Sequence, residues 1–209
     1  MSDAISQLVV DAGWKIKSLL RTRRFYCDAD LISLYKSHLL GFLEYRTPAI
    51  YHATRGVLSR LDRLQARFLE KSGINEVEAL MEFNLAPLCT RRDIAMLGLI
   101  HRTVLGKGPQ HFQGLFSQVS LHAGRPVVKD MRTTLKHPLV RRSALGLAAI
   151  YNLLPASFVR APSVSTFQSR LQEYVKARAC AGCADWQDSL SPRLALEGHP
   201  VLSADVMDI

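Results

Sequence analysis

Long apolar runs and a secretory leader are both missing from this sequence. No stretch comes near the ~20 consecutive apolar residues that a bilayer-spanning helix requires. Residues 1–3 carry no basic charge, and no apolar segment of the leader type follows them. We therefore expect no transmembrane helix and no secretion, and we predict an intracellular protein, nuclear or cytoplasmic.

Cysteine is scarce, with only four residues in a chain of 209. So few thiols favour the reduced state of an intracellular protein. Cys180 and Cys183 form a lone Cys-x-x-Cys, but a structural zinc site needs four ligands and only His199 follows as a further candidate. We expect free thiols, and we predict neither a metal site nor a cofactor in this chain.

Recognisable catalytic constellations are missing as well. The seven histidines are scattered, and none is paired with a cysteine or serine in a nucleophile arrangement. Asp28 and Asp30 follow an aromatic pair, as aspartates do in some metal-dependent polymerase sites, but they are not adjacent and they open a helix. We interpret one of them as the N-cap of that helix, so the sequence predicts no catalytic residue.

Positive charge and material for a core are present. Hydrophobic residues make up 48% of the chain and charged residues 22%, which is ordinary for a globular protein. Lys and Arg outnumber Asp and Glu by 27 to 18, which gives a formal net charge of +9. This excess favours a polyanionic partner, either nucleic acid or an acidic membrane surface, without choosing between them.

The N-terminal segment, residues 4–20, has the pattern of an amphipathic helix with a basic end. Its apolar residues recur at helical spacing from Ile5 to Leu20. Cations accompany and follow them: Lys15, Lys17, Arg21, Arg23 and Arg24. These side chains either cover a solvated helix end, where they also complement the helix dipole, or contact phosphates.

Residues 31–71 predict two helices around which the rest of the chain is organised. The first is apolar on nearly all sides up to Tyr45, so it should be buried, and it ends before Pro48. The second begins near Thr54 and stops before Gly73, which we expect to form a left-handed C-cap.

The second of these helices carries a basic stripe. Spacings of 3, 4 and 4 residues place four cations on one side of it: Arg60, Arg63, Arg67 and Lys71. The stripe is either a phosphate-binding surface or an ordinary solvated face, and Glu70 could neutralise part of it.

Further helices are predicted downstream from their capping residues. Asn75 should cap a short helix, and Thr90 with Asp93 resembles a capping box for a helix that runs to Leu105. Another helix should cover about 139–153, and Ser163 should cap the last one.

Two segments lack a helical pattern. Residues 117–137 are basic and aperiodic, which predicts a long connector. The last segment, 179–209, is acidic, and we expect it to be mostly disordered and dispensable for folding. The sequence thus predicts an all-α protein with helical groups at 1–116 and 138–178, a connector at 117–137 and a tail at 179–209.

Several segments, taken in order, resemble one protein family. They are residues 34–36 (LYK), 43–45 (LEY), 61–67 (LDRLQAR), 85–92 (LAPLCTRR), 150–155 (IYNLLP) and 161–171 (APSVSTFQSRL). They resemble the segments that follow the catalytic palm in non-LTR (LINE-type, jockey-like) retrotransposon reverse transcriptases. The last two are the most specific, although Tyr151 stands where the family usually has tryptophan and Gln168 where it usually has lysine.

The resemblance implies that the chain is the thumb and post-thumb region of an RNA-directed DNA polymerase. A thumb grips the template–primer duplex, RNA–DNA or DNA, through its backbone, so the basic residues at 15–24 and 60–71 become nucleic-acid-binding candidates. The palm and fingers, with the Mg²⁺-binding aspartates of the full enzyme, are missing from this sequence, so we expect no polymerase activity from the chain alone. A helical protein–protein module and a degenerate relic stay open as alternatives, and the buried-looking helices disfavour a peripheral membrane binder.

Overall fold

The computed structural model describes residues 2–116, 118–122, 125–128, 130 and 137–202. Helices dominate it, which confirms the predicted all-α class. The chain divides into an N-terminal unit, Met1–Arg92, and a C-terminal unit, Asp93–Ile209. The division thus falls inside helix α7 (Leu88–Val104) and not in the connector where the sequence predicted it, because an uninterrupted helical pattern conceals a change of unit.

The N-terminal unit is built from helices and helical turns alone. They are α1 (Ser2–Thr22), η1 (Arg23–Phe25), α2 (Asp28–Tyr35), the π-helical turn η2 (Lys36–Leu40), α3 (Gly41–Glu44), α4 (Thr47–Ile50), α5 (Arg55–Ser72), α6 (Glu76–Met81) and the beginning of α7. The single helix predicted for residues 31–45 is therefore three consecutive segments, with a widened π turn between α2 and α3.

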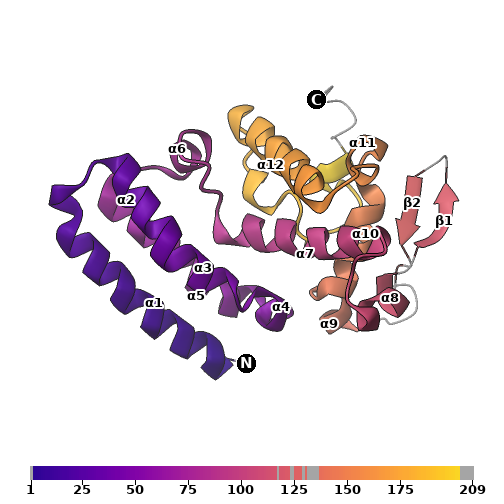
Figure 1. Cartoon of the computed structure of the whole chain (residues 1–209), viewed down its shortest axis with the longest axis horizontal. Helices are drawn as coiled ribbons and strands as arrows, with labels where there is room; N and C mark the ends of the chain where they lie inside the picture. Colours follow the sequence, from indigo (N-terminus) through magenta and orange to yellow (C-terminus); the bar gives the residue numbers. More distant parts are fainter. Residues whose placement is uncertain (1, 117, 123–124, 129, 131–136, 203–209) are drawn as a thin grey trace. The chain divides into compact units, whose positions relative to one another are not determined.

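Helix α1 packs along α5 and against the α2–α3 segment (Figure 1). Ser6 near the start of α1 contacts Arg60, and Arg23 just after α1 contacts Lys71, so α1 and α5 run in the same direction. Tyr35 stacks on Phe68 in the core of this unit, with ring centroids 4.4 Å apart. The predicted burial of the apolar helix is confirmed for most of its residues, namely Leu31, Ile32, Tyr35, Leu39, Leu40 and Leu43.

Local capping signals place several helix ends as predicted. Gly73 has φ +79° and ends α5, a conformation that costs glycine little because it lacks a Cβ. Asn75 accepts a hydrogen bond from the Glu78 amide at 2.8 Å, and the Glu78 carboxylate reaches back to the Asn75 amide. Ser163 accepts from the Thr166 amide at 3.1 Å.

Other capping predictions were wrong. Cys27 holds the N-cap position of α2, and Asp28 is already the first helical residue, where its charge favours the helix N-terminus without capping it. Thr90 lies inside α7, which begins at Leu88 directly after Pro87, so it forms no capping box with Asp93. Tyr45, expected to be buried, is 87% exposed at the end of α3.

The C-terminal unit contains the remainder of α7 and a series of shorter elements. They are α8 (Gln110–Phe116), β1 (Gln118–His122), β2 (Arg125–Val128), α9 (Pro138–Arg141), α10 (Ala144–Leu153), α11 (Ala156–Val159), α12 (Val164–Cys180) and η3 (Trp186–Asp188). Two helices, α9 and α10, stand where the sequence predicted one at about 139–153.

A β-hairpin occupies part of the predicted connector. Strands β1 and β2 pair antiparallel, with Leu121 opposite Pro126 and His122 opposite Arg125, and the register shifts between Gln118 and Ser120. The expectation of an aperiodic loop was therefore wrong for these strands, while most of the rest of residues 117–137 lies outside the described residues. A hairpin this short carries too few alternating residues to be distinguished from a loop by pattern.

The segment that gives the most specific sequence resemblance lies in the core of the C-terminal unit. Tyr151 and Phe167 are buried around His101, whose ring stacks on Phe167 with centroids 4.3 Å apart. The Asn152 side chain bonds to strand β2 as a neighbouring strand would. Its Oδ1 accepts from the Val128 backbone N–H at 2.9 Å, and its Nδ2 donates to the Val128 carbonyl at 2.7 Å. These motif residues therefore hold the fold together and present no stacking surface.

The predicted disordered tail is packed as far as residue 202. Trp186, Leu190 and Val201 are 7%, 1% and 1% exposed. The predicted disorder is therefore wrong for residues 179–202, this burial argues against the tail being dispensable, and residues 203–209 lie outside the described part of the chain. The segment folds in turns and 3₁₀ geometry, which leave no helical or strand period in the sequence.

Polar groups of α12 anchor this irregular segment. The Tyr174 hydroxyl donates to the Pro200 carbonyl at 2.8 Å. Burial raises the pKa of Tyr174 to about 12, so the hydroxyl keeps its proton and stays a donor at neutral pH. Arg178, 7% exposed, pairs with Asp185 at 2.6 Å. Backbone carbonyls outside regular structure thus find side-chain partners.

Candidate nucleic-acid interface

The cations at the end of α1 all lie on the surface, as a phosphate-binding role requires. Lys15, Lys17, Arg21, Arg23 and Arg24 are exposed. Aromatic rings support some of them: the Lys15 ammonium lies 5.1 Å from the Phe42 ring centroid, and the Arg24 guanidinium lies 4.8 Å from that of Phe25. Such contacts orient a cation without neutralising it.

The predicted stripe on α5 divides into structural and solvent-facing members. Arg60 is half-buried and donates to Ser6 Oγ at 2.9 Å, which ties α5 to α1. Arg63 is exposed and donates to the Ser59 carbonyl of its own helix at 3.2 Å. Arg67 and the Lys71 ammonium are exposed and make no hydrogen bond or ion pair within the described residues. The half of the stripe nearest the end of α5 is therefore the half available to a ligand.

The structure brings the two predicted basic segments together at the end of α5. The Arg23 guanidinium donates to the Lys71 carbonyl, 48 residues away in sequence. A surface pocket of about 550 Å³ lies here, and Arg24 and Tyr26 contribute to it with Arg23 and Lys71. Asp28 and Glu70 also line it, so the pocket has mixed charge and is not a dedicated site for a small anion.

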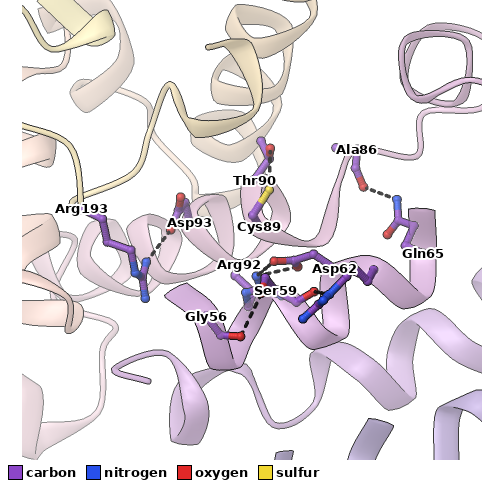
Figure 2. Close-up of polar contacts among 11 residues, drawn as sticks. Gly56, Ser59, Asp62, Gln65, Ala86, Cys89, Thr90, Arg92, Asp93 and Arg193 are labelled. Carbon is purple, nitrogen blue, oxygen red and sulfur yellow. Dashed lines mark hydrogen bonds and ion pairs between the residues drawn. The ribbon is translucent and has the colours of Figure 1, made fainter. Parts of the chain in front are cut away.

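The two adjacent arginines of the resemblance segment at 85–92 both form ion pairs within the N-terminal unit. Arg92 is buried and binds both carboxylate oxygens of Asp62, at 2.7 and 3.0 Å (Figure 2). Arg91 forms an ion pair with Glu44. Arg92 thereby engages the carboxylate of Asp62, the acidic residue in the middle of α5. These arginines therefore stabilise the N-terminal unit and are not candidates for ligand contact.

A buried hydroxyl lies near these ion pairs. The Tyr35 hydroxyl has no hydrogen-bond partner among the described residues, and Gln65 uses its amide nitrogen on the Ala86 carbonyl at 3.0 Å (Figure 2). Burial, followed by the nearby negative charge of Glu44, raises the pKa of Tyr35 well above its usual value. Tyr35 is therefore neutral at neutral pH, and its ring packs in the core of the N-terminal unit.

Exposed aromatic residues were missed by the sequence reasoning. Trp14 is 64% exposed, and Phe25 and Tyr26 are exposed beside Arg24. A signal for Trp14 was available: Val10, Trp14, Lys17 and Arg21 are spaced 4, 3 and 4 residues apart, on the side of α1 opposite its buried face. The helical spacing of the apolar residues predicts the buried side of α1, and the residues on its opposite side were not considered as a surface.

Metal ligation finds no support in the described part of the chain. No group of three or more His, Cys, Asp or Glu is arranged there to hold an ion. Cys180 and Cys183 are free thiols. His199, the further zinc candidate, instead donates from Nε2 to the Ser191 carbonyl at 3.1 Å and accepts from the Val201 amide at 3.3 Å. Its ring nitrogens are thereby occupied by the folded tail.

None of the described helices combines the length and the apolar character that a membrane span needs.

Comparison with known proteins gives no further identification. No family model, no curated protein and no solved structure matches the chain. The likeness to non-LTR reverse transcriptases described above therefore stays a prediction.

Proposed function

We propose that the N-terminal unit binds the phosphate backbone of a nucleic-acid duplex, RNA–DNA or DNA, as the thumb-like part of a retroelement reverse transcriptase. The observation that carries the proposal is the convergence of Arg23, Arg24 and Lys71 on one surface from segments far apart in sequence. Catalysis, with its Mg²⁺-binding palm, would belong to another part of such an enzyme.

The geometry suits a long, repetitive polyanion. Helix α5 has 18 residues, which corresponds to about 27 Å at 1.5 Å per residue and could follow several phosphates. Its free cations, Arg67 and Lys71, stand on flexible stems, and backbone contacts need charge more than fixed geometry. The mixed charge around Glu70 argues against a small anion, which would need a concentrated positive site.

A helical protein–protein module is the second candidate function. The specific observation in its favour is apolar exposure, at Val10, Trp14 and Tyr45. Cation-mediated duplex binding and apolar protein contact differ in their dependence on salt, so one measurement separates them.

The test is the salt dependence of duplex binding. Arg21, Arg67 and Lys71 are exposed, and changing all three to Gln keeps helix propensity and touches no core residue. Binding of the wild-type chain to a labelled template–primer duplex should weaken steeply with salt. In the triple variant the log–log slope should flatten by about 2 to 3 units, at about 0.9 per lost phosphate contact.

A matched control removes the same charge from the C-terminal unit. The Arg102→Gln, Lys107→Gln and Lys176→Gln substitutions in one chain should leave the slope nearly unchanged. Equal flattening in both variants would show that only net charge matters. A wild-type chain whose duplex binding is absent or insensitive to salt would overturn the proposal and favour the protein–protein module.

A further inference from the structure

A groove separate from the basic pocket lies between α1 and the π-helical turn η2. It has a volume of about 430 Å³ and is lined by Trp14, Lys15, Ser18, Leu19, His38 and Leu39. None of these six lining residues, all in the described part of the chain, carries a carboxylate. The groove thus differs from the pocket at the end of α5, where Asp28 and Glu70 offset the cations.

Trp14 is the main apolar wall of this groove. An indole that is 64% exposed forgoes much of the stabilisation that burial gives an aromatic ring. The Lys17 ammonium lies 5.5 Å from the Trp14 ring centroid, and Lys15 lies in the groove itself. The nearest acid along α1, Asp11, accepts a hydrogen bond from Gln7 at 2.9 Å. An exposed π face with cations around it is the arrangement that single-stranded nucleic acid uses.

The opposite wall comes from the irregular part of the α2–α3 segment. The π-helical turn, which inserts an extra residue into the helical path, contributes His38 and Leu39. Single π turns within α-helices occur often at functional sites. His38 is exposed, and its imidazole can donate or accept a hydrogen bond at the edge of a bound ring.

We propose that this groove holds an unpaired base of a nucleic-acid strand, stacked on Trp14, with the adjoining phosphates on Lys15 and Lys17. The inference deepens the proposed function, since it adds a site for the single strand that extends from a gripped duplex. Stacking on an aromatic ring accepts any base, so the site recognises single-strandedness and not sequence. The absence of carboxylates from the lining suits any anionic partner, and the exposed indole of Trp14 favours a nucleic-acid strand over an acidic protein surface.

The experiment compares a short oligothymidylate with an abasic strand of the same length and charge. Both carry the same phosphates, so only stacking distinguishes them. Wild-type protein should bind oligothymidylate more tightly and lose fluorescence on binding, because Trp14 is exposed while the second tryptophan, Trp186, is buried. Trp14→Ala should weaken oligothymidylate binding by about 5- to 150-fold and leave abasic binding within about twofold.

Two variants sharpen the comparison. Trp14→Leu keeps an apolar side chain without a π face, so it should lose nearly as much affinity as Trp14→Ala. Tyr45→Ala removes another highly exposed aromatic residue that does not line the groove, and it should change neither affinity. Because both positions are exposed, the melting temperatures should stay close to that of the wild-type chain.

Several results would overturn the inference. Equal binding of the thymidylate and abasic strands by the wild-type chain would exclude base stacking. Loss of affinity for both strands in Trp14→Ala would make Trp14 a positioning residue for the cations. If Trp14→Ala instead abolished self-association or binding to anionic phosphatidylserine vesicles, the groove would belong to a second copy or to a lipid surface.

The duplex proposal can fail independently. The salt slope of the Arg21, Arg67 and Lys71 variant reports on duplex contacts, whereas the abasic comparison reports on Trp14. If Trp14 discriminates thymidylate from abasic strands as expected, but the triple variant leaves the salt slope of duplex binding unchanged, the protein binds single strands without these duplex contacts. If the triple variant flattens the salt slope, but thymidylate and abasic strands bind equally, the duplex contacts stand and the base-binding site is excluded.

Discussion

Basic residues in the two units do different work. In the N-terminal unit, Arg67 and Lys71 extend from a regular helix into solvent. In the C-terminal unit, arginines bind backbone carbonyls instead: Arg141 donates to Leu194 at 3.0 Å, and Arg193 to Arg142 at 3.3 Å. A positive net charge therefore says little about an interface until the partner of each cation is known.

The difference follows from how each unit satisfies its backbone. Within the long helices α1 and α5, helical hydrogen bonds pair most carbonyls, so cations such as Arg67 and Lys71 need not serve the fold, although Arg60 does. The irregular segment at 181–202 has no long helix to pair its carbonyls, and arginine, with five N–H donors, binds two of them, those of Leu194 and Pro200. We expect removal of a solvent-facing cation such as Arg67 or Lys71 to cost binding, and removal of an arginine that holds a backbone carbonyl, such as Arg141, to cost stability.

The largest predicted effect comes from removing the folded tail. A chain that ends at Arg178 loses the buried Trp186, Leu190 and Val201. Each buried side chain of this kind is worth about 1.5 to 3 kcal/mol, so the free energy of unfolding of the C-terminal unit should fall by roughly 5 kcal/mol or more. Urea unfolding followed by circular dichroism measures it, and Trp186→Ala alone should cost about 3 to 5 kcal/mol. Unfolding unchanged from the full chain would show that the tail adds nothing to the fold.

Removal of one anchoring arginine should have the next largest effect. Arg178→Gln breaks the 2.6 Å pair with Asp185 and a longer contact to the Pro200 carbonyl at 3.5 Å. Because Arg178 is buried while Asp185 stays partly exposed, we expect a loss of about 2 to 3 kcal/mol, below that of a fully buried pair. Lys176→Gln on the same helix is the control and should change stability by less than about 0.5 kcal/mol. Equal effects of the two substitutions would contradict an anchoring role.

Sequence reasoning succeeded where the signal was local. Gly73, Asn75 and Ser163 were predicted as caps, because a cap depends on a few neighbouring residues. Thr90 failed because Pro87, a stronger signal for a helix start, lies just before it. The best sequence resemblance, around Tyr151, turned out to be core.

The candidate site was predicted only in part for the same reason. The cations on α1 and α5 could be named from spacing, and their convergence at Arg23 and Lys71 could not, because it depends on the parallel packing of two distant helices. The structural role of Arg60 depends on Ser6, 54 residues away. The exposure of Trp14, by contrast, could have been predicted, because helical spacing places it with Lys17 on the side of α1 opposite the buried face.

The third prediction concerns acid sensitivity of the C-terminal unit. His101 donates from Nε2 to the Ala161 carbonyl at 3.0 Å and accepts at Nδ1 from the Tyr151 hydroxyl at 2.9 Å. Desolvation by burial lowers the pKa of His101 below its ordinary value near 6.5. Protonation is therefore easier in the unfolded chain, and stability should fall as the pH drops below about 6.5, towards the lower folded pKa.

The measurement is the free energy of unfolding between neutral and mildly acid pH. His101→Gln can keep both hydrogen bonds without a titrating group, although it loses the stacking on Phe167. The variant should be less stable at neutral pH and show a shallower decline in acid. A decline identical to that of the wild-type chain would assign the acid sensitivity to other groups.

The smallest predicted effect separates two arginines of one helix face. Arg67→Gln removes an exposed side chain without a partner in the described residues, so its stability change should stay within about 0.5 kcal/mol. Arg60→Gln breaks the bond to Ser6 and should cost about 0.5 to 1.5 kcal/mol. Ser6→Ala removes the same bond and also the bond from its hydroxyl to the Ser2 carbonyl at 2.8 Å, and the double variant should lose less than the sum of the two single losses, because both changes remove the Arg60–Ser6 interaction. Duplex binding should rank the two arginines in the opposite order, with Arg67→Gln flattening the salt slope by about one unit and Arg60→Gln by less. If the same arginine substitution had the larger effect on both stability and the salt slope, that arginine would contribute to the fold and to duplex binding together.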